Sequence, residues 1–354
     1  MKHDATSRDG SRRDRGTRAR SRATGRVTLA DVAALAGVSP ITASRVVAGK
    51  TTVRPELADR VQDAVARLGY RPDPSARALA SAKSGHIVVL IPLLSNTLFT
   101  ELLEAIQDVM WDAGYPIFVG ITQYQPSREA ALLENYLSHR PAGLILTGFD
   151  RSDVVRRLIA DSRTPCVHVM ELSDEPGVHC VGFSQVDAAE TVARHLLDRG
   201  RRRIAFVGAQ LDPRTLERAD GFRRALSLAG RYDPRLEVLD ARPSSAALGA
   251  EAFRRLLTAH PDVDAMFFCN DDLAHGALLE ALRLGIPIPD RVSVVGFNDL
   301  PGNEQMLPPL TSLRTPRREV GDAAAKMLLR LIRDETVPTP VIDLGFALKI
   351  RESS

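Results

Sequence analysis

The chain has 354 residues, 44% of them hydrophobic, and a net charge of +3, which suits two or three soluble globular domains. No apolar run reaches 18 residues and the first 25 residues lack the apolar centre of a signal peptide, so we expect a cytoplasmic protein without a membrane segment. The cysteines, Cys166, Cys180 and Cys269, are odd in number and far apart. We expect them to be reduced core residues, neither catalytic nor metal-binding.

The charge is distributed unevenly along the chain. Residues 1–84 hold 17 Lys and Arg against 8 Asp and Glu, a net of +9, which leaves −6 for the rest. A basic end is typical of a nucleic-acid-binding segment. Residues 1–25 are rich in Ser, Arg and Gly and cannot bury a core, so we expect a disordered basic tail. This tail either contacts phosphates nonspecifically or is only a solubilising extension.

Two short helices joined by a glycine turn are predicted within residues 27–50. Thr28 and Asp31 form a capping-box pattern at the start of the first helix, and Gly37 ends it. Ser39 is placed to cap the second helix. The apolar residues fall at helical spacing and include many alanines, which lets the two helices cross closely, as in a helix-turn-helix.

The second helix carries the residues that would contact a partner. Its outer face presents Ile41, Thr42, Ser44 and Arg45. A helix presented in this way fits the major groove of B-DNA, with its N-terminal residues near the base edges. Because arginine can bond bidentately to guanine, Arg45 is the strongest candidate for reading a base. Taken alone, the pattern also allows an ordinary helical hairpin with a solvated polar face.

A third helix is predicted from Pro55 to Gly69, with an apolar stripe that closes a three-helix core. Pro72 and Pro74 then break the chain. The following residues 75–81, SARALAS, can form a helix that is too short to be stable alone.

This region resembles the N-terminal domain of the lactose-repressor (LacI) family of bacterial transcription regulators over two runs, VTLADVAALAGVSPITASRVVAGK and VRPELADRVQDAVARLGYRPDPSARALAS. The resemblance continues to the C-terminus. It implies a DNA-binding domain at 26–72, a hinge helix or linker at 73–84, and an effector-binding and dimerisation core at 85–354.

In the LacI family the second helix reads the operator. The resemblance therefore implies base contacts by Pro40, Ile41 and Arg45, and phosphate contacts by Thr42 and Ser44. The full set of implied DNA-contacting residues is Thr28, Ser39, Pro40, Ile41, Thr42, Ser44, Arg45, Arg54, Tyr70, Ala76 and Leu79.

Two positions in this set carry further expectations. Arg54 stands where the family usually has Ser or Thr, so the third helix loses a side-chain cap and could gain a phosphate contact. Leu79 matches the leucine that paired hinge helices insert into a minor-groove step, and Ala76 leaves room for that pairing. A plain linker is the alternative for this stretch.

From His86 onward, apolar strands alternate with amphipathic helices, which predicts parallel sheets covered on both faces and divided into two similar lobes. We expect strands at Ile87–Ile91, Pro116–Val119, Leu144–Leu146, Cys166–Val169, Ile204–Val207, Ala265–Phe268 and Val292–Val295. The resemblance implies an α/β core like a periplasmic sugar-binding protein. Its N-lobe would comprise about 85–182 and 313–336, and its C-lobe about 183–312 and 337–354.

Ligands of open parallel sheets bind beyond the C-terminal ends of the strands, where this sequence places polar residues. With those that the resemblance implies, the candidate effector-binding residues are Ser95, Asn96, Phe99, Thr147, Glu171, Phe183, Arg214, Arg218, Asn270 and Asn298. Phe99 is either an aromatic flap over the pocket or a buried core residue.

Two arginines favour an acidic effector. Arg218 matches the family's arginine that grips an effector's hydroxyls or carboxylate, and Asn298 stands where many sugar- and purine-binding members have Asp. Loss of that charge, together with two guanidinium groups, favours a carboxylate ligand. The alternative for Arg214 and Arg218 is a surface ion pair with Glu217 or Asp220 on the same helix.

Four segments, LPPLTSLRTPR, LDPRTLERADGF, FCNDDLAHGA and IDLGFAL, resemble the gluconate-operon repressor subgroup. This implies a homodimeric repressor that binds a near-palindromic double-stranded DNA operator and responds to a sugar acid such as gluconate or a keto-gluconate. A neutral sugar or purine effector is the alternative. Signatures of nucleotide-binding loops, hydrolase elbows and zinc proteases do not occur, so neither an enzyme nor a cofactor is expected. A sugar-transport protein would share the core but lack the basic head.

Overall fold

The computed structural model describes residues 27–49, 53–71 and 85–354. The chain divides into two compact units, 1–84 and 85–354, called here the head and the core. The predicted tail and the predicted hinge helix, including Ala76 and Leu79, lie outside the described residues.

The head is built from three helices, α1 (Leu29–Ala36), α2 (Pro40–Val47) and α3 (Pro55–Leu68). Small apolar residues fill the space between them, among them Val32, Ala33, Ala43, Val61 and Ala64. In the described ranges, no single helix is long and apolar enough to cross a bilayer; α1 and α2 reach that composition only as a pair bent by 106°.

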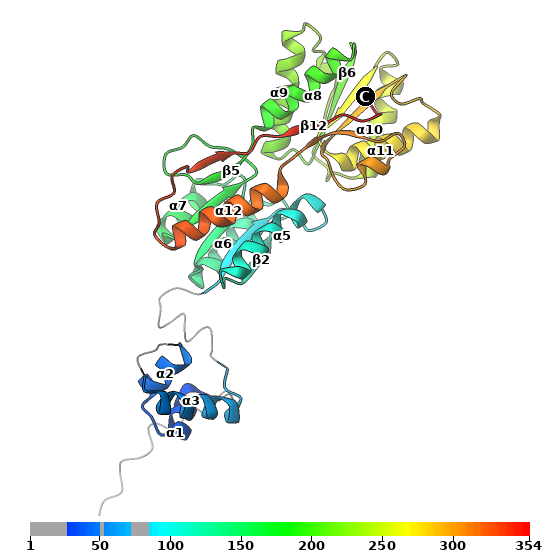
Figure 1. Ribbon diagram of the computed structural model, residues 1–354. Coiled ribbons are helices and arrows are strands. Elements are labelled where there is room, and N and C mark those ends of the chain that lie inside the picture. Colours follow the sequence, from blue (N-terminus) through cyan, green and yellow to red (C-terminus); the bar gives the residue numbers. More distant parts are fainter. Residues whose placement is uncertain (1–26, 50–52, 72–84) are drawn as a thin grey trace, which may run out of the picture. The chain divides into compact units, whose positions relative to one another are not determined.

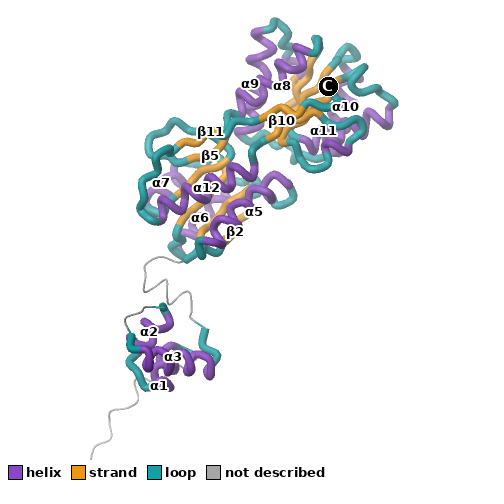
Figure 2. Tube along the Cα trace, in the orientation of Figure 1, coloured by secondary structure: helices purple, strands orange, loops and turns teal. Residues whose placement is uncertain are grey.

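The fully described core, residues 85–354, contains two six-stranded sheets, which Figures 1 and 2 show as separate lobes. The N-lobe sheet has the order β11-β5-β4-β3-β1-β2, and the C-lobe sheet the order β12-β10-β9-β8-β6-β7. The N-lobe strands are β1 (Ile87–Ile91), β2 (Ile117–Ile121), β3 (Gly143–Thr147), β4 (Cys166–Val169), β5 (Cys180–Gly182) and β11 (Val341–Asp343). The C-lobe strands are β6 (Ile204–Ala209), β7 (Glu237–Asp240), β8 (Ala265–Phe268), β9 (Ser293–Asn298), β10 (Thr311–Arg314) and β12 (Ala347–Lys349).

Helices cover both faces of each sheet, as the alternation of strands and helices predicts. The N-lobe helices are α5 (Thr97–Asp112), α6 (Pro126–Ser138), α7 (Asp153–Ser162) and α12 (Arg317–Ile332). The C-lobe helices are α8 (Gln185–Asp198), α9 (Pro213–Leu228), α10 (Ala246–Ala259) and α11 (Asp271–Leu284). Strand β1 has apolar side chains on both faces of the sheet, and helices bury both: Val89 packs on the side of α5, while Val88 and Leu90 pack on the side of α6.

Helices α10 and α11 cross closely at Gly276. A Cβ atom at this position would overlap the backbone carbonyl of Ala246, the first residue of α10. Only glycine therefore fits here without separating the two helices.

The chain passes between the lobes three times: from β5 to α8, from β10 to α12, and from β11 to β12. The expected assignment of residues 337–354 to the C-lobe is therefore wrong for its first part. Strand β11 pairs in parallel with β5 of the N-lobe, and only β12 returns to pair antiparallel with β10. The expected N-lobe segment 313–336 is wrong at its start, because residues 313 and 314 are the end of β10 and belong to the C-lobe sheet. Each of these strands is too short to reveal its sheet from its own residues.

Candidate functional site

The helix-turn-helix of the head has the predicted caps. The Thr28 backbone N–H donates to Asp31 at 2.8 Å, and the Thr28 hydroxyl accepts from the Asp31 N–H at 3.4 Å, which completes the capping box. The Ser39 hydroxyl accepts from the Thr42 N–H at 3.1 Å, so α2 begins at Pro40 as predicted. Gly37 ends α1 in the left-handed conformation at a φ of 65°, so the turn between the helices is fixed by Gly37 on one side and Ser39 on the other.

The outer face of α2 presents most of the predicted residues to solvent. Ser39, Pro40, Ser44 and Arg45 are exposed, and Ile41 is 67% exposed. An isoleucine left this open on a stable helix is available to meet a thymine methyl group.

The remaining predicted head residues have mixed surroundings. Thr42 is half-buried, and its hydroxyl lies 2.9 Å from that of Ser39, so part of its hydrogen-bonding capacity serves the cap. Arg54 precedes α3 without making a side-chain cap, as expected, and is exposed. Tyr70 packs half-buried against the head's apolar core.

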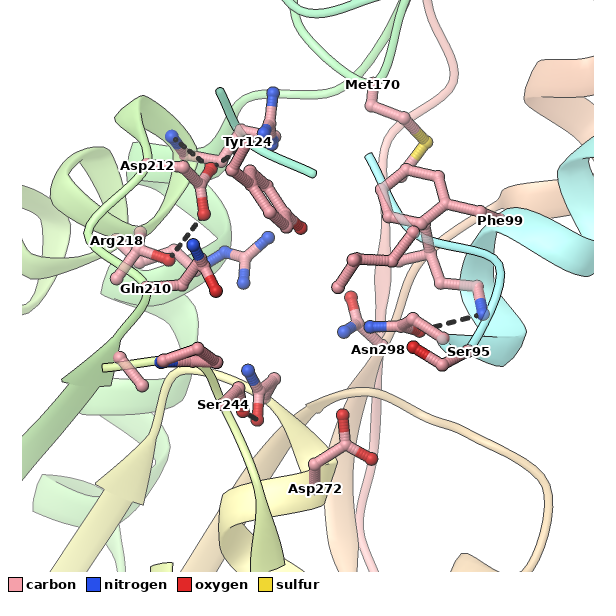
Figure 3. Close-up of a pocket in the computed structure, with 18 residues that line it drawn as sticks. Ser95, Phe99, Tyr124, Met170, Gln210, Asp212, Arg218, Ser244, Asp272 and Asn298 are labelled. Atoms are coloured by element: carbon pink, nitrogen blue, oxygen red, sulfur yellow. Dashed lines mark hydrogen bonds and ion pairs between the residues drawn. The ribbon is translucent and has the colours of Figure 1, made fainter. Parts of the chain in front are cut away.

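A cavity lies between the two lobes of the core, at the C-terminal ends of β1, β6, β8 and β9 (Figure 3). Seven of the ten predicted effector residues line it: Ser95, Asn96, Phe99, Arg214, Arg218, Asn270 and Asn298. Both lobes contribute, so a ligand in this cavity would contact the N-lobe and the C-lobe together.

Arg218 reaches this cavity from α9 and is buried. Its Nε donates to Gln185 Oε1 at 2.8 Å and its Nη1 to the Cys269 carbonyl at 2.6 Å. The guanidinium carbon lies 3.9 Å from the centre of the Phe297 ring. No salt bridge joins Arg218 to a carboxylate anywhere in the described ranges, and burial lowers the pKa of its guanidinium. A buried cation whose hydrogen-bond partners are neutral suits an anionic ligand.

Arg214, one turn earlier, already has carboxylate partners. Its Nη1 donates to Glu171 at 2.6 Å and its Nη2 to Asp212 at 2.9 Å, and all three residues are largely buried. Burial alone would lower the pKa of Arg214, but the charges of Asp212 and Glu171 outweigh burial and raise it. The second oxygen of Glu171 accepts from the Phe149 N–H at 3.2 Å. Arg214 therefore joins the C-lobe to the N-lobe, and the proposed pair with Glu217 or Asp220 does not form.

Two asparagines add polar groups to the cavity. Asn298 ends β9 at a φ of 107°, a conformation that costs strain in a residue with a side chain, and its buried Oδ1 has no hydrogen-bond partner among the described residues. Asn270 caps α11 by accepting from the Leu273 N–H at 3.1 Å, and it also accepts from Ser244 at 2.9 Å. Both suit a ligand rich in hydroxyl groups.

The comparisons with known proteins agree with the fold of both units. Residues 28–73 match the family model for bacterial regulatory proteins of the lacI family, and residues 193–354 match the periplasmic binding protein-like domain. The chain is 54% identical over 334 residues to the HTH-type transcriptional regulator GntR of Pseudomonas aeruginosa, covering 94% of this chain and 97% of that one.

The chain belongs to the lacI family of bacterial transcriptional regulators. Among solved structures, it is similar to the transcription regulator GntR from Chromobacterium violaceum, with 47% identity, a TM-score of 0.75, and coverage of 76% of this chain and 99% of that chain. It is also similar to the Lac repressor dimer bound to operator and the anti-inducer ONPF, with 26% identity, a TM-score of 0.81, and coverage of 93% and 99%.

Three predicted effector residues of this lacI-family regulator do not line the cavity. Thr147 donates to the Leu90 carbonyl at 3.0 Å and lines a neighbouring hollow. The Glu171 carboxylate forms the buried ion pair with Arg214. Phe183 is fully buried and packs with Phe297, their ring centres 6.5 Å apart, because it belongs to the apolar core. Phe99 is both a buried core residue and a cavity residue, since it is 4% exposed and part of it lines the cavity.

Several residues that line the cavity of this regulator were not predicted from the sequence, among them Tyr124, Met170, Gln210, Asp212 and Asp272. Tyr124 and Gln210 follow β2 and β6, whose true ends lie two residues beyond the predicted ones. Both residues have positive φ values, 55° and 70°, so they occupy tight turns that the apolar pattern does not reveal. Asp272 had a usable signal, because it is the second residue of a helix whose cap, Asn270, closely follows a strand.

Proposed function

We propose that this regulator is a repressor whose operator affinity is controlled by a sugar acid such as gluconate or a keto-gluconate, acting on genes of sugar-acid catabolism. The observation that carries the effector class is the buried Arg218, which holds its charge without a carboxylate partner. The surrounding amide and hydroxyl groups offer both donors and acceptors to a polyol chain. Of the two arginines, Arg218 is the one left to bind a carboxylate, since Glu171 and Asp212 neutralise Arg214.

The exposed face of α2 is the surface that would bind the operator. A homodimer would place two heads in successive major grooves of a near-palindromic operator, and Arg45 would select a guanine. Because phosphate contacts release counterions, operator affinity should fall steeply as salt rises. The hinge residues Ala76 and Leu79 would add a minor-groove contact at the operator centre.

Coupling between effector and operator requires two arrangements of the lobes. A ligand that contacts both lobes would bind their closed arrangement more tightly than their open one. It would shift the population of molecules toward the closed arrangement by the difference between these two binding free energies. The three chain crossings would carry the movement to the start of the N-lobe, from which the chain leads back to the head. We infer that effector binding releases the operator.

A thermal-shift panel on the full-length protein tests the effector class. At about 100 times its dissociation constant, a true effector adds roughly 2.7 kcal/mol to the free energy of unfolding. We expect gluconate or a keto-gluconate to raise the melting temperature, and neutral sugars and purines to leave it unchanged. Preference for a neutral sugar or a purine would overturn the sugar-acid proposal and leave the repressor assignment intact.

A matched pair of variants links the shift to Arg218. Arg218→Gln should lose the gluconate response and keep operator affinity, because the head does not depend on this side chain. Arg224→Gln is the control, since Arg224 is an exposed arginine on the same helix. Equal responses of the two variants would contradict the assignment.

A further inference from the structure

Asp272 lies in the same cavity as Arg218, at the start of a different helix. It is the second residue of α11, directly after Asn270 and Asp271. In Figure 3, Asp272 lies near Ser244 on one side of the cavity and Arg218 enters from another side. The cavity thus has a carboxylate, that of Asp272, on a different side from Arg218.

The Asp272 carboxylate has no partner of its own. It makes no hydrogen bond and no salt bridge with any residue in the described part of the chain, although the side chain is half-buried. Burial raises its pKa, against the opposing charge of His275. Desolvating a carboxylate without a donor is unfavourable, and a ligand with hydroxyl groups would remove that cost.

Helix stabilisation does not account for Asp272 by itself. An acidic residue in the first turn does interact favourably with a helix N-terminus. At this terminus, however, Asn270 already supplies the cap, and Asp271 is fully buried where it accepts from the Ser312 hydroxyl at 2.6 Å and the Leu300 N–H at 2.7 Å. Of the two aspartates, only Asp272 faces the cavity.

We propose that Asp272 determines effector specificity by accepting hydrogen bonds from hydroxyl groups at the end of the effector farther from its carboxylate. This inference rests on the proposed function, in which Arg218 holds the carboxylate. A polyhydroxy monocarboxylate satisfies both side chains, because its acid end meets the cation and its hydroxyl end meets Asp272. A dicarboxylate of the same length brings a second negative charge to Asp272 and is disfavoured.

Isothermal titration calorimetry of the full-length protein tests this with three probes: D-gluconate, D-glucarate and D-glucitol. These share a six-carbon polyol chain and carry one, two and no carboxylates. In the wild type, gluconate should bind at least about tenfold more tightly than glucarate, the effect of one unpaired like-charge contact. Asp272→Asn should weaken gluconate binding and reduce the gluconate preference by at least about tenfold.

The matched control is Asp187→Asn. Asp187 is an exposed aspartate in the first turn of α8 and does not line the cavity, so its removal changes helix electrostatics alone. This variant should keep the wild-type preference. An unchanged preference in Asp272→Asn, or equal binding of both acids by the wild type, would overturn the inference.

The glucitol arm separates this inference from the proposed function. If the wild type binds glucitol and neither acid, the sugar-acid proposal fails while Asp272 can still be tested. Weaker glucitol binding by Asp272→Asn would then uphold the hydroxyl contact, and unchanged binding would overturn it. A wild type that binds none of the three probes, and no keto-gluconate in the thermal-shift panel, overturns both.

Discussion

The ion pair between Glu171 and Arg214 provides the sharpest test of how the lobes are held together. Glu171→Gln keeps the size of the side chain and one acceptor oxygen but removes the charge. The Glu171 oxygens accept from Arg214 at 2.6 Å and from the Phe149 N–H at 3.2 Å, and Arg214 keeps Asp212 at 2.9 Å. Because one charge-assisted hydrogen bond is lost or weakened, we expect a loss of about 2 kcal/mol. The upper bound is the roughly 3–5 kcal/mol for deleting one partner of a buried pair.

Calorimetry of the full-length protein can measure this loss as a fall in melting temperature of roughly 4–8 °C. The control is Glu104→Gln, which breaks the exposed pair between Glu104 and Arg318, 3.1 Å apart, and should change little. Because Glu171 and Arg214 belong to different lobes, gluconate affinity should also fall in Glu171→Gln. Equal melting temperatures for the two variants would refute the view that a buried bond joins the lobes.

Three further changes test other parts of the molecule. Gly276→Ala should destabilise the C-lobe by about 1–3 kcal/mol through overpacking, and an unchanged thermal unfolding curve would contradict the close crossing of α10 and α11. Burial and the charge of Arg151 lower the pKa of His168 to about 4, so the unfolded chain takes up a proton between pH 6.5 and 4 that the folded protein does not. Stability is therefore lost as the pH falls through that window, by at most about 1.4 kcal/mol per pH unit, and urea unfolding of His168→Gln should show a shallower loss. Arg45→Ala should weaken operator binding by about 1–3 kcal/mol and nonspecific binding less; equal losses in fluorescence anisotropy titrations would exclude base reading.

The elements that were predicted well carry their signals locally. The caps at Thr28 and Ser39 lie within a few residues of the groups that they bond. The fully buried strands, such as β1 and β8, are continuous apolar runs. Each of these features depends on short-range chemistry that a single stretch of sequence displays.

Two of the missed features depend on contacts between distant residues. Glu171 and Arg214 are separated by 43 positions, and nothing near either residue shows that they meet. The lobe of β11 is set by its pairing with β5, about 160 residues earlier in the chain. Arg214 was expected to be free for the same reason, since Glu171 reaches it from another strand end; its second partner, Asp212, is local and only two residues before it.

The triple crossing between the lobes affects how this protein can be made. The N-lobe needs α12 and β11, which follow β6 through β10 of the C-lobe in the chain. The C-lobe in turn needs β12, and Ser353, whose hydroxyl donates to the Val294 carbonyl at 2.6 Å. A ribosome releasing the chain from its N-terminus therefore delivers β11 and β12 well after the strands with which they pair. Until then the edges of β5 and β10 stay open to other chains, so the nascent protein should need chaperone protection until β11 and β12 have emerged.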